Sequence, residues 1–166
     1  MVHDTRLTFL DKLLEALGAS FLICALAIPL VNYAKIPDVI PIHFDLAGVP
    51  NGIGSKIHLI IVPLLGVVIY VGLFFVKKYS INMNYPIPVT TTNREDLQRL
   101  TLQMMRWLRV VIALFFMILV ISMVRIGLGV SGRANIYFLI YFLLALAGIV
   151  GFYMYRMIQL HQDPDE

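Results

Sequence analysis

Four long apolar runs, separated by short polar segments, dominate the hydropathy pattern of the 166-residue chain. A helix needs about 20 apolar residues to cross the hydrocarbon core of a bilayer. The four runs each reach about this length, and they cover residues 13–33, 57–76, 107–127 and 136–157. The pattern therefore predicts an all-α integral membrane protein with four transmembrane helices, organised as a single membrane domain over residues 1–166.

The composition supports a membrane environment. Hydrophobic residues make up 60% of the chain and charged residues only 14%, whereas soluble proteins have about 25% charged residues. The net charge is +3, but no basic stripe with interleaved aromatic residues is present, so we expect a lipid bilayer and no nucleic acid as partner. Cys24 is the single cysteine, which excludes an intrachain disulfide.

The basic residues predict the orientation of the chain in the membrane. With four spans, the two termini and the loop between spans two and three share one side, which carries nine Lys and Arg residues. The other side carries four, namely Lys35, Lys56, Arg125 and Arg133. Because basic residues concentrate on the cytoplasmic side, we expect both termini in the cytoplasm and the loop at residues 36–56 outside.

Ionisable residues near the apolar runs lie close to the ends of the spans. Glu15 and Arg109 are predicted at the same cytoplasmic end, where they are expected to pair, and Arg125 lies at the opposite end. Charged residues inside a bilayer usually mark ion or substrate pathways. The middle of the predicted membrane carries none, which argues against an ion pathway through one copy of the chain.

Small residues predict where the helices touch. Without a hydrophobic drive between helices in lipid, close packing of small side chains becomes important. Ala16, Ser20 and Cys24 recur every four residues in the first span, and Ala147 and Gly151 do so in the fourth. We expect both stripes to form helix contacts.

A capping signal precedes the third span. Thr92 and Glu95 have the spacing of a capping box, which predicts a helix that continues unbroken into the span at residues 107–127. The first part of this helix is amphipathic. Two interpretations remain open for it: a plain extension of the span, or a surface that docks a regulatory protein.

The loop at residues 36–56 is the most informative segment. Its part from Ile40 to Leu46 is expected to be extended, with His43 and Asp45 on one face and Phe44 on the other. The residues expected to shape the loop are prolines and glycines that favour turns, together with a serine that would cap the second span: Pro41, Gly48, Pro50, Gly52, Gly54 and Ser55.

The same loop contains the candidate binding residues. Polar, charged and aromatic side chains on a shaped outward loop are suited to capture a peptide or lipid at the outer surface. His43 and Asp45 are expected to be the polar readers of such a ligand. The full set of candidate ligand-binding residues is His43, Phe44, Asp45, Asn51 and Lys56.

Metal binding and catalysis receive less support. His43, Asp45 and His58 are weak candidates for zinc ligands, since imidazole and carboxylate groups bind zinc. Their spacing matches no established metal signature, so no metal or other cofactor is expected. Ser55 is the obvious loop serine, but its expected capping role explains it. His43 with Asp45 is a candidate acid–base pair, but nothing identifies a third partner or a substrate pocket. No catalytic residue is therefore assigned, and the question of an enzyme stays open, with the balance against one.

The loop motif also carries a family resemblance. Residues 36–56 read IPDVIPIHFDLAGVPNGIGSK, and the span that follows contains Pro63. This pattern resembles the membrane family called domain of unknown function 1648, which is similar to the N-terminal part of the SdpI-type immunity proteins. The resemblance covers about residues 20 to 70. It implies a bacterial inner-membrane protein that gives immunity to, or senses, a membrane-active peptide through its outward loop. The alternative is a structural or assembly subunit of a membrane complex such as a transporter.

Overall fold

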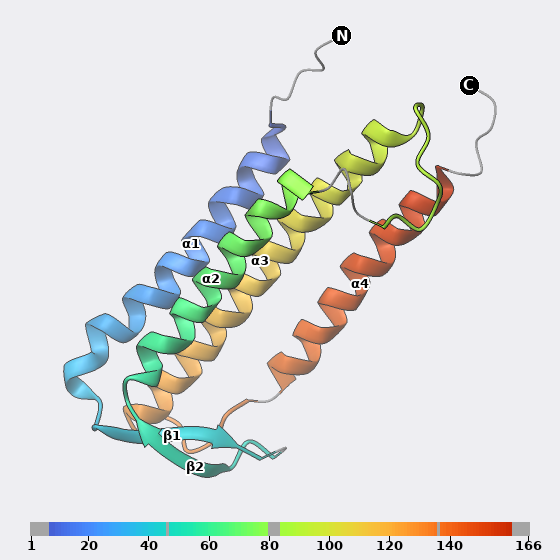
Figure 1. The fold of residues 1–166 in the computed structure, drawn as a ribbon. Helices are drawn as coiled ribbons and strands as arrows, with labels where there is room; N and C mark the ends of the chain where they lie inside the picture. The colour runs from blue at the N-terminus through green and yellow to red at the C-terminus, as the bar shows by residue number, and fades with distance from the viewer. Residues whose placement is uncertain (1–6, 46, 80–83, 136, 161–166) are drawn as a thin grey trace.

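The computed structural model of the chain describes residues 7–45, 47–79, 84–135 and 137–160. Four long helices run side by side (Figure 1). They are α1 (Phe9–Asn32), α2 (His58–Tyr79), α3 (Arg94–Gly127) and α4 (Tyr137–Gln159). Each is long and apolar enough to cross a membrane, which confirms the predicted multi-pass arrangement. Leu46 and Ile136, which belong to the predicted extended segment and the predicted fourth span, lie outside the described residues.

Helix α3 is the centre of the arrangement. It packs against α1, α2 and α4, whereas α4 packs mainly along α3 and stands apart from α1 and α2 (Figure 1). The start of α1 and the end of α4 lie at one end of the molecule, which we call the terminal end. The opposite end carries two short strands, and we call it the hairpin end.

The loop between α1 and α2 folds into a β-hairpin. A short 3-10 turn, η1 (Tyr33–Lys35), leads into β1 (Val39–Phe44), which pairs antiparallel with β2 (Pro50–Ser55). The fold is therefore mostly helical with a small two-stranded sheet, so the prediction of an all-α protein is correct for the spans only. The segment from Pro50 to Gly52 was predicted as a turn and is instead part of a strand.

The described part of the hairpin turn consists of Asp45 and residues 47–49. The Asp45 carboxylate accepts hydrogen bonds from the amides of Ala47 and Val49 at 2.8 and 2.9 Å. Gly48 has a φ of +73°, a conformation that strongly favours glycine. Because Asp45 and Gly48 already close the turn here, Pro50 is left free to begin the second strand. The amide of Ala134, in the loop between α3 and α4, donates to the Gly48 carbonyl at 2.9 Å.

Apolar side chains anchor the hairpin to the helices. Ile36 and Ile40 are 3% and 1% exposed, and they form one buried cluster with Leu59 of α2 and with Val120, Met123 and Val124 of α3. Gly127, the last residue of α3, permits this contact, because a Cβ there would lie 2.9 Å from Ile36 Cγ2. The hairpin is thus held against the ends of α2 and α3.

Glycines set the spacing of the three-helix bundle. A Cβ at Gly18 of α1 would lie 2.7 Å from the Tyr70 hydroxyl, and one at Gly66 of α2 would lie 2.7 Å from the Phe116 ring. The buried stripe of α1 contains Leu14, Gly18 and Leu22, followed by Ala25 and Pro29. Small residues therefore do mediate packing.

The predicted small-residue stripes do not form helix contacts within the described chain. Ala16, Ser20 and Cys24 are exposed, because α1 is rotated to bury the Gly18 face. Ala147 and Gly151 are also exposed, and no atom lies within 4 Å of a Cβ built at Gly151. The reason is that α4 contacts α3 through its other face.

Reciprocal side-chain hydrogen bonds occur in the turn before α3 and at the start of α1. In front of α3 the pair is Thr90 with Asn93: the Thr90 amide donates to Asn93 Oδ1 at 2.9 Å and the Asn93 amide donates to Thr90 Oγ1 at 3.2 Å. These two bonds close the turn that precedes α3, and the long unbroken helix that the capping signal predicted is present. Thr8 and Asp11 form a capping box at α1.

Ion pairs join α1 to α3 near the terminal end. Arg106 Nη1 lies 2.8 Å from Asp11 Oδ1, and Arg106 Nε lies 3.5 Å from Glu15 Oε1. Arg109 Nη2 donates a hydrogen bond to Glu15 Oε1. The predicted pairing of Glu15 with Arg109 is confirmed, and it belongs to a network of four charged side chains.

The docking of the hairpin turn on Ala134 can be tested with two alanine substitutions. Gly48→Ala and Gly129→Ala both place a Cβ at a φ near +72°, a cost of about 1–2 kcal/mol. At Gly48 the Cβ would also lie 2.0 Å from the Ala134 carbonyl oxygen, whereas Gly129 faces open space. We expect Gly48→Ala to lower the apparent midpoint of thermal unfolding more than Gly129→Ala.

Hydrogen exchange gives a second measurement for the same pair. Exchange at the Ala134 amide should accelerate in Gly48→Ala and not in Gly129→Ala, because only the first substitution pushes this amide from its acceptor. Equal unfolding midpoints together with unchanged exchange at Ala134 would show that the turn does not depend on this contact.

Candidate functional site

The exposed surface of the hairpin carries a polar pair. His43 Nδ1 lies 2.5 Å from Asn51 Oδ1 across the two strands, and both residues belong to the candidate binding set. The pairing register shifts around His43, and a Cβ at the opposing Gly52 would lie 2.9 Å from His43 Cβ. Within the described residues His43 Nε2 has no partner, so it is available to donate or accept a hydrogen bond from a ligand.

Asp45 and Lys56, two other candidate residues, hold the hairpin in shape. Both amides that Asp45 binds belong to its own turn. Lys56 Nζ lies 2.8 Å from Asp38 Oδ1 and 3.3 Å from the Ile36 carbonyl oxygen, and it sits 4.8 Å from the centre of the Tyr33 ring. Lys56 therefore connects the start of α2 back to the segment that enters β1.

The Lys56–Asp38 pair affects the acidity of Asp38. The hydrogen bond from Lys56 and its positive charge hold the pKa of the Asp38 carboxyl below its ordinary value. The Lys56 side chain is 19% exposed but that of Asp38 is 91% exposed, so water screens the attraction strongly. The pair therefore orients the hairpin more than it stabilises the fold.

The remaining loop residues contribute to shape. Phe44 was expected on the outward surface of the loop. It is half-buried, so its ring is only partly available to a ligand. A Cβ at Gly54 would lie 2.4 Å from Ile42 Cδ1, so glycine at this position leaves room for the Ile42 side chain. The Ser55 hydroxyl accepts a hydrogen bond at 3.3 Å from the amide of Ile57, just before α2 begins at His58.

The three weak metal candidates do not converge. His43 contacts Asn51, Asp45 binds turn amides, and His58 Nδ1 lies 2.7 Å from the Ser55 carbonyl oxygen. In the described ranges no group of three His, Cys, Asp or Glu side chains is positioned to hold a metal ion.

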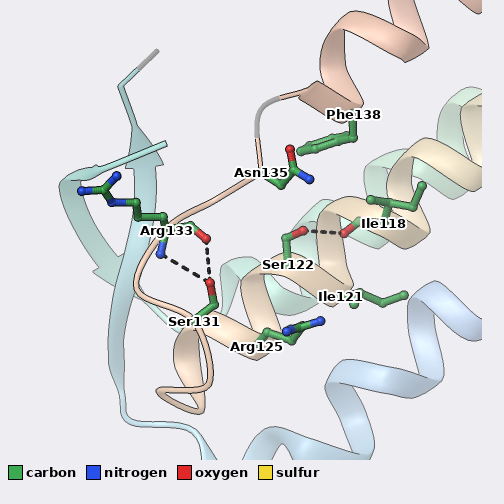
Figure 2. A pocket seen from close by; sticks show the side chains of 8 residues that line it. All are labelled: Ile118, Ile121, Ser122, Arg125, Ser131, Arg133, Asn135 and Phe138. Carbon is green, nitrogen blue, oxygen red and sulfur yellow. Dashed lines mark hydrogen bonds between the residues drawn. The ribbon is translucent and has the colours of Figure 1, made fainter. Parts of the chain in front are cut away.

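A cavity of about 380 Å³ lies beside the hairpin, between the end of α3 and the start of α4 (Figure 2). This volume falls within the range of roughly 300–1,000 Å³ that is usual for ligand pockets. Its apolar wall is formed by Ile118, Ile121 and Phe138. Its polar lining consists of Ser122, Arg125, Ser131, Arg133 and Asn135.

Two positive charges without acidic partners define the electrostatics of this cavity. Arg125 and Arg133 are exposed, and neither forms an ion pair with a described residue. Arg133 extends away from Ile118 and Ile121, while Asn135 lies beside the Phe138 ring (Figure 2). An apolar wall with the unpaired Arg125 guanidinium beside it, and with Arg133 on the hairpin side, suits an amphipathic ligand that carries an anionic group.

Sequence reasoning missed this cavity. Arg125 was interpreted as a residue at the end of a span, and the short segment between spans three and four received no role. The available signal was the clustering of Arg125, Ser131, Arg133 and Asn135 in eleven positions beside an apolar run. Their convergence depends on the path of the α3–α4 loop, where Ser131 Oγ donates to the Arg133 carbonyl at 2.8 Å.

The comparisons with known proteins bear on the hairpin region. Residues 21–67 match the family model described as Domain of unknown function (DUF1648). The match confirms the resemblance inferred from the loop motif, and it spans the later part of α1, η1, the hairpin and the first part of α2. No curated protein and no solved structure matches the chain. The similarity to SdpI-type immunity proteins stays a prediction.

The match places the hairpin and its anchors in relation to the DUF1648 segment. Both helix prolines, Pro29 and Pro63, are fully buried and lie inside it. The segment also contains Ile36, Ile40 and Leu59, whereas the part of α3 that receives them lies outside it. The DUF1648 segment therefore packs on a helix from the rest of the chain.

The orientation of the hairpin by Lys56 predicts a pH effect. Because the folded-state pKa of Asp38 is lowered, its contribution is present at neutral pH and is lost as the pH falls through that lowered pKa. A carboxyl titration followed by NMR should show the Asp38 midpoint rising toward its ordinary value in Lys56→Gln. Lys35→Gln removes a nearby exposed cation and should leave the midpoint almost in place; equal shifts in both variants would contradict the specific pairing.

Proposed function

We propose that this protein binds a membrane-active peptide at the outer surface of a bacterial inner membrane, and thereby senses it or gives immunity to it. The observation that carries the proposal is the cavity beside the hairpin, which combines apolar walls with Arg125 and Arg133. A membrane-active peptide is itself amphipathic. One of its apolar side chains would lie against Ile121 and Phe138, its carboxylate would meet Arg125, and Arg133 would add positive charge on the hairpin side.

The hairpin contributes a rigid edge to this proposed site. Its turn is bound to the α3–α4 loop through Gly48 and Ala134, next to Arg133. Its exposed His43–Asn51 pair offers a further hydrogen-bonding position on the same end of the molecule. The positive-inside pattern predicts that this end faces the outside of the cell, where a secreted peptide would arrive.

The proposal predicts the outcome of a protection assay. A sensitive bacterial strain expressing the chain would be challenged with a panel of membrane-active peptides, and we expect survival to rise for at least one. Replacing both Arg125 and Arg133 by Gln should abolish protection, and replacing His43 and Asn51 by Ala should reduce it. Arg99→Gln removes an exposed cation from the terminal end and should protect like the wild type at equal membrane levels.

The role assigned to the two arginines has its own measurement. A protective peptide would be prepared with a free C-terminal carboxylate and with an amidated C-terminus. Loss of a charge-assisted hydrogen bond typically weakens binding by roughly tenfold or more, so the amide should bind the purified protein more weakly. Survival equal to that of an empty vector with every peptide would refute the proposed function.

A second candidate function, a subunit of a membrane complex, is supported by the exposure of α4. This helix packs mainly on α3, and its Gly148 and Gly151 face open space. Close approach of a partner helix is favoured at such positions. If α4 docks on a partner protein, replacing both Gly148 and Gly151 by Leu should release that partner. The protein should then migrate as a smaller species on native gels of solubilised membranes from the cells that produce it. Gly72→Leu, which also faces open space on α2, should leave the species unchanged.

A further inference from the structure

A second cavity, of about 480 Å³, lies near the terminal end of the bundle, far from the hairpin. It is an open cavity bordered by α1, α2 and α3, and five of its eight lining residues are apolar. The polar side chains in its lining are those of Glu15, Arg106 and Arg109. The apolar part of the lining consists of Leu7, Leu73, Phe74, Leu102 and Met105.

Arg109 is the residue in this lining that the fold leaves incompletely satisfied. It is 5% exposed, and its Nη2 binds Glu15, but its Nε and Nη1 atoms are buried without a hydrogen-bond partner. A guanidinium group has five N–H donors and is always charged. Native proteins rarely leave buried donors of a charged group unpaired, so each such group calls for an explanation.

Two aromatic rings lie close to the Arg109 guanidinium but supply no oxygen acceptor for its free N–H groups. Its Cζ atom lies 4.8 Å from the centre of the Phe74 ring and 5.2 Å from that of the Tyr70 ring. These contacts attract the positive charge of the group, whereas its Nε and Nη1 atoms still have no hydrogen-bond acceptor among the described residues. Acceptor oxygens from another molecule would complete the coordination of Nε and Nη1.

The unpaired donors of Arg109 favour an anionic ligand. Two arginines and Glu15 lie in the lining, and Asp11 is bound to Arg106 at 2.8 Å, so the four charges of the network balance while Arg109 Nε and Nη1 still have no acceptor. The positive-inside pattern places this end at the cytoplasmic leaflet, where anionic lipids are found. Apolar walls beside a buried cation match a molecule with an anionic headgroup and an acyl chain.

We propose that this cavity binds an anionic phospholipid from the cytoplasmic leaflet. Its phosphate oxygens accept hydrogen bonds from Arg109 Nε and Nη1, and one acyl chain lies along Leu73, Phe74 and Leu102. The bound lipid then acts as a ligand that stabilises the packing of α1 against α2 and α3. This site is independent of the proposed peptide site, which lies at the hairpin end.

The test is lipid-dependent thermal unfolding of the purified full chain in a non-ionic detergent. Phosphatidylglycerol, phosphatidylcholine of the same chain length and inorganic phosphate would each be titrated. A ligand at one hundred times its dissociation constant should raise the unfolding midpoint by roughly 5–10 °C for a chain of this size. We expect this rise with phosphatidylglycerol alone. An equal rise with phosphatidylcholine or with inorganic phosphate would overturn the proposal.

Matched variants separate the site from a general effect of the lipid. Leu102→Trp fills the cavity without changing a charge and should abolish the shift, whereas Ile118→Trp fills the cavity at the hairpin end and should retain it. A shift that persists in Leu102→Trp would place the lipid elsewhere.

Glu15→Gln distinguishes lipid binding from a purely structural role of Glu15, because lipid binding predicts a larger lipid-induced rise of the unfolding midpoint in this variant. It keeps the shape of the side chain but removes a negative charge beside Arg109. Even if this variant is less stable, phosphatidylglycerol should bind it more tightly and give a larger shift than in the wild type. An unchanged or smaller shift would contradict binding of the phosphate at Arg109.

Discussion

The packing of Ile36 and Ile40 against the ends of α2 and α3 is the contact on which the arrangement of the hairpin end depends. Backbone amides and carbonyls of a loop need partners or water, so a loop next to a membrane cannot simply cover apolar helix ends. Here the β-hairpin pairs its own backbone and turns isoleucines toward the helices. Gly127 leaves the space that this contact needs.

From this anchor, the hairpin reaches the α3–α4 loop through the Gly48–Ala134 hydrogen bond. The cavity lined by Arg125 and Arg133 forms where that loop returns to α4. The position of the cavity is therefore set by three segments that are distant in sequence: the DUF1648 segment, the end of α3 and the start of α4. Residues from the hairpin need not line the cavity in order to position it.

Helix α3 also organises the charges of the molecule. Arg109 and Arg125 are separated along it by about 24 Å, at a rise of 1.5 Å per residue, which is close to the roughly 30 Å thickness of the hydrocarbon core. The residues between them are apolar apart from Ser122, whose hydroxyl donates to the Ile118 carbonyl at 3.0 Å. Helix α3 thus carries one arginine toward each end of its apolar stretch, and the residues between the two arginines are uncharged.

The sequence by itself determined the four spans, because a run of about 20 apolar residues has few alternatives to crossing a bilayer as a helix. It also indicated the shaped loop and its family, and the pairing of Glu15 with Arg109 near one membrane surface. Only the tertiary structure decided which face of each helix is buried: α1 uses Gly18 rather than Ala16 and Ser20. In spans that are apolar all round, hydrophobicity does not distinguish a packed face from a lipid-exposed one. The same limit hid both cavities, since their lining comes from helices whose rotation and partners are set by packing across the whole bundle.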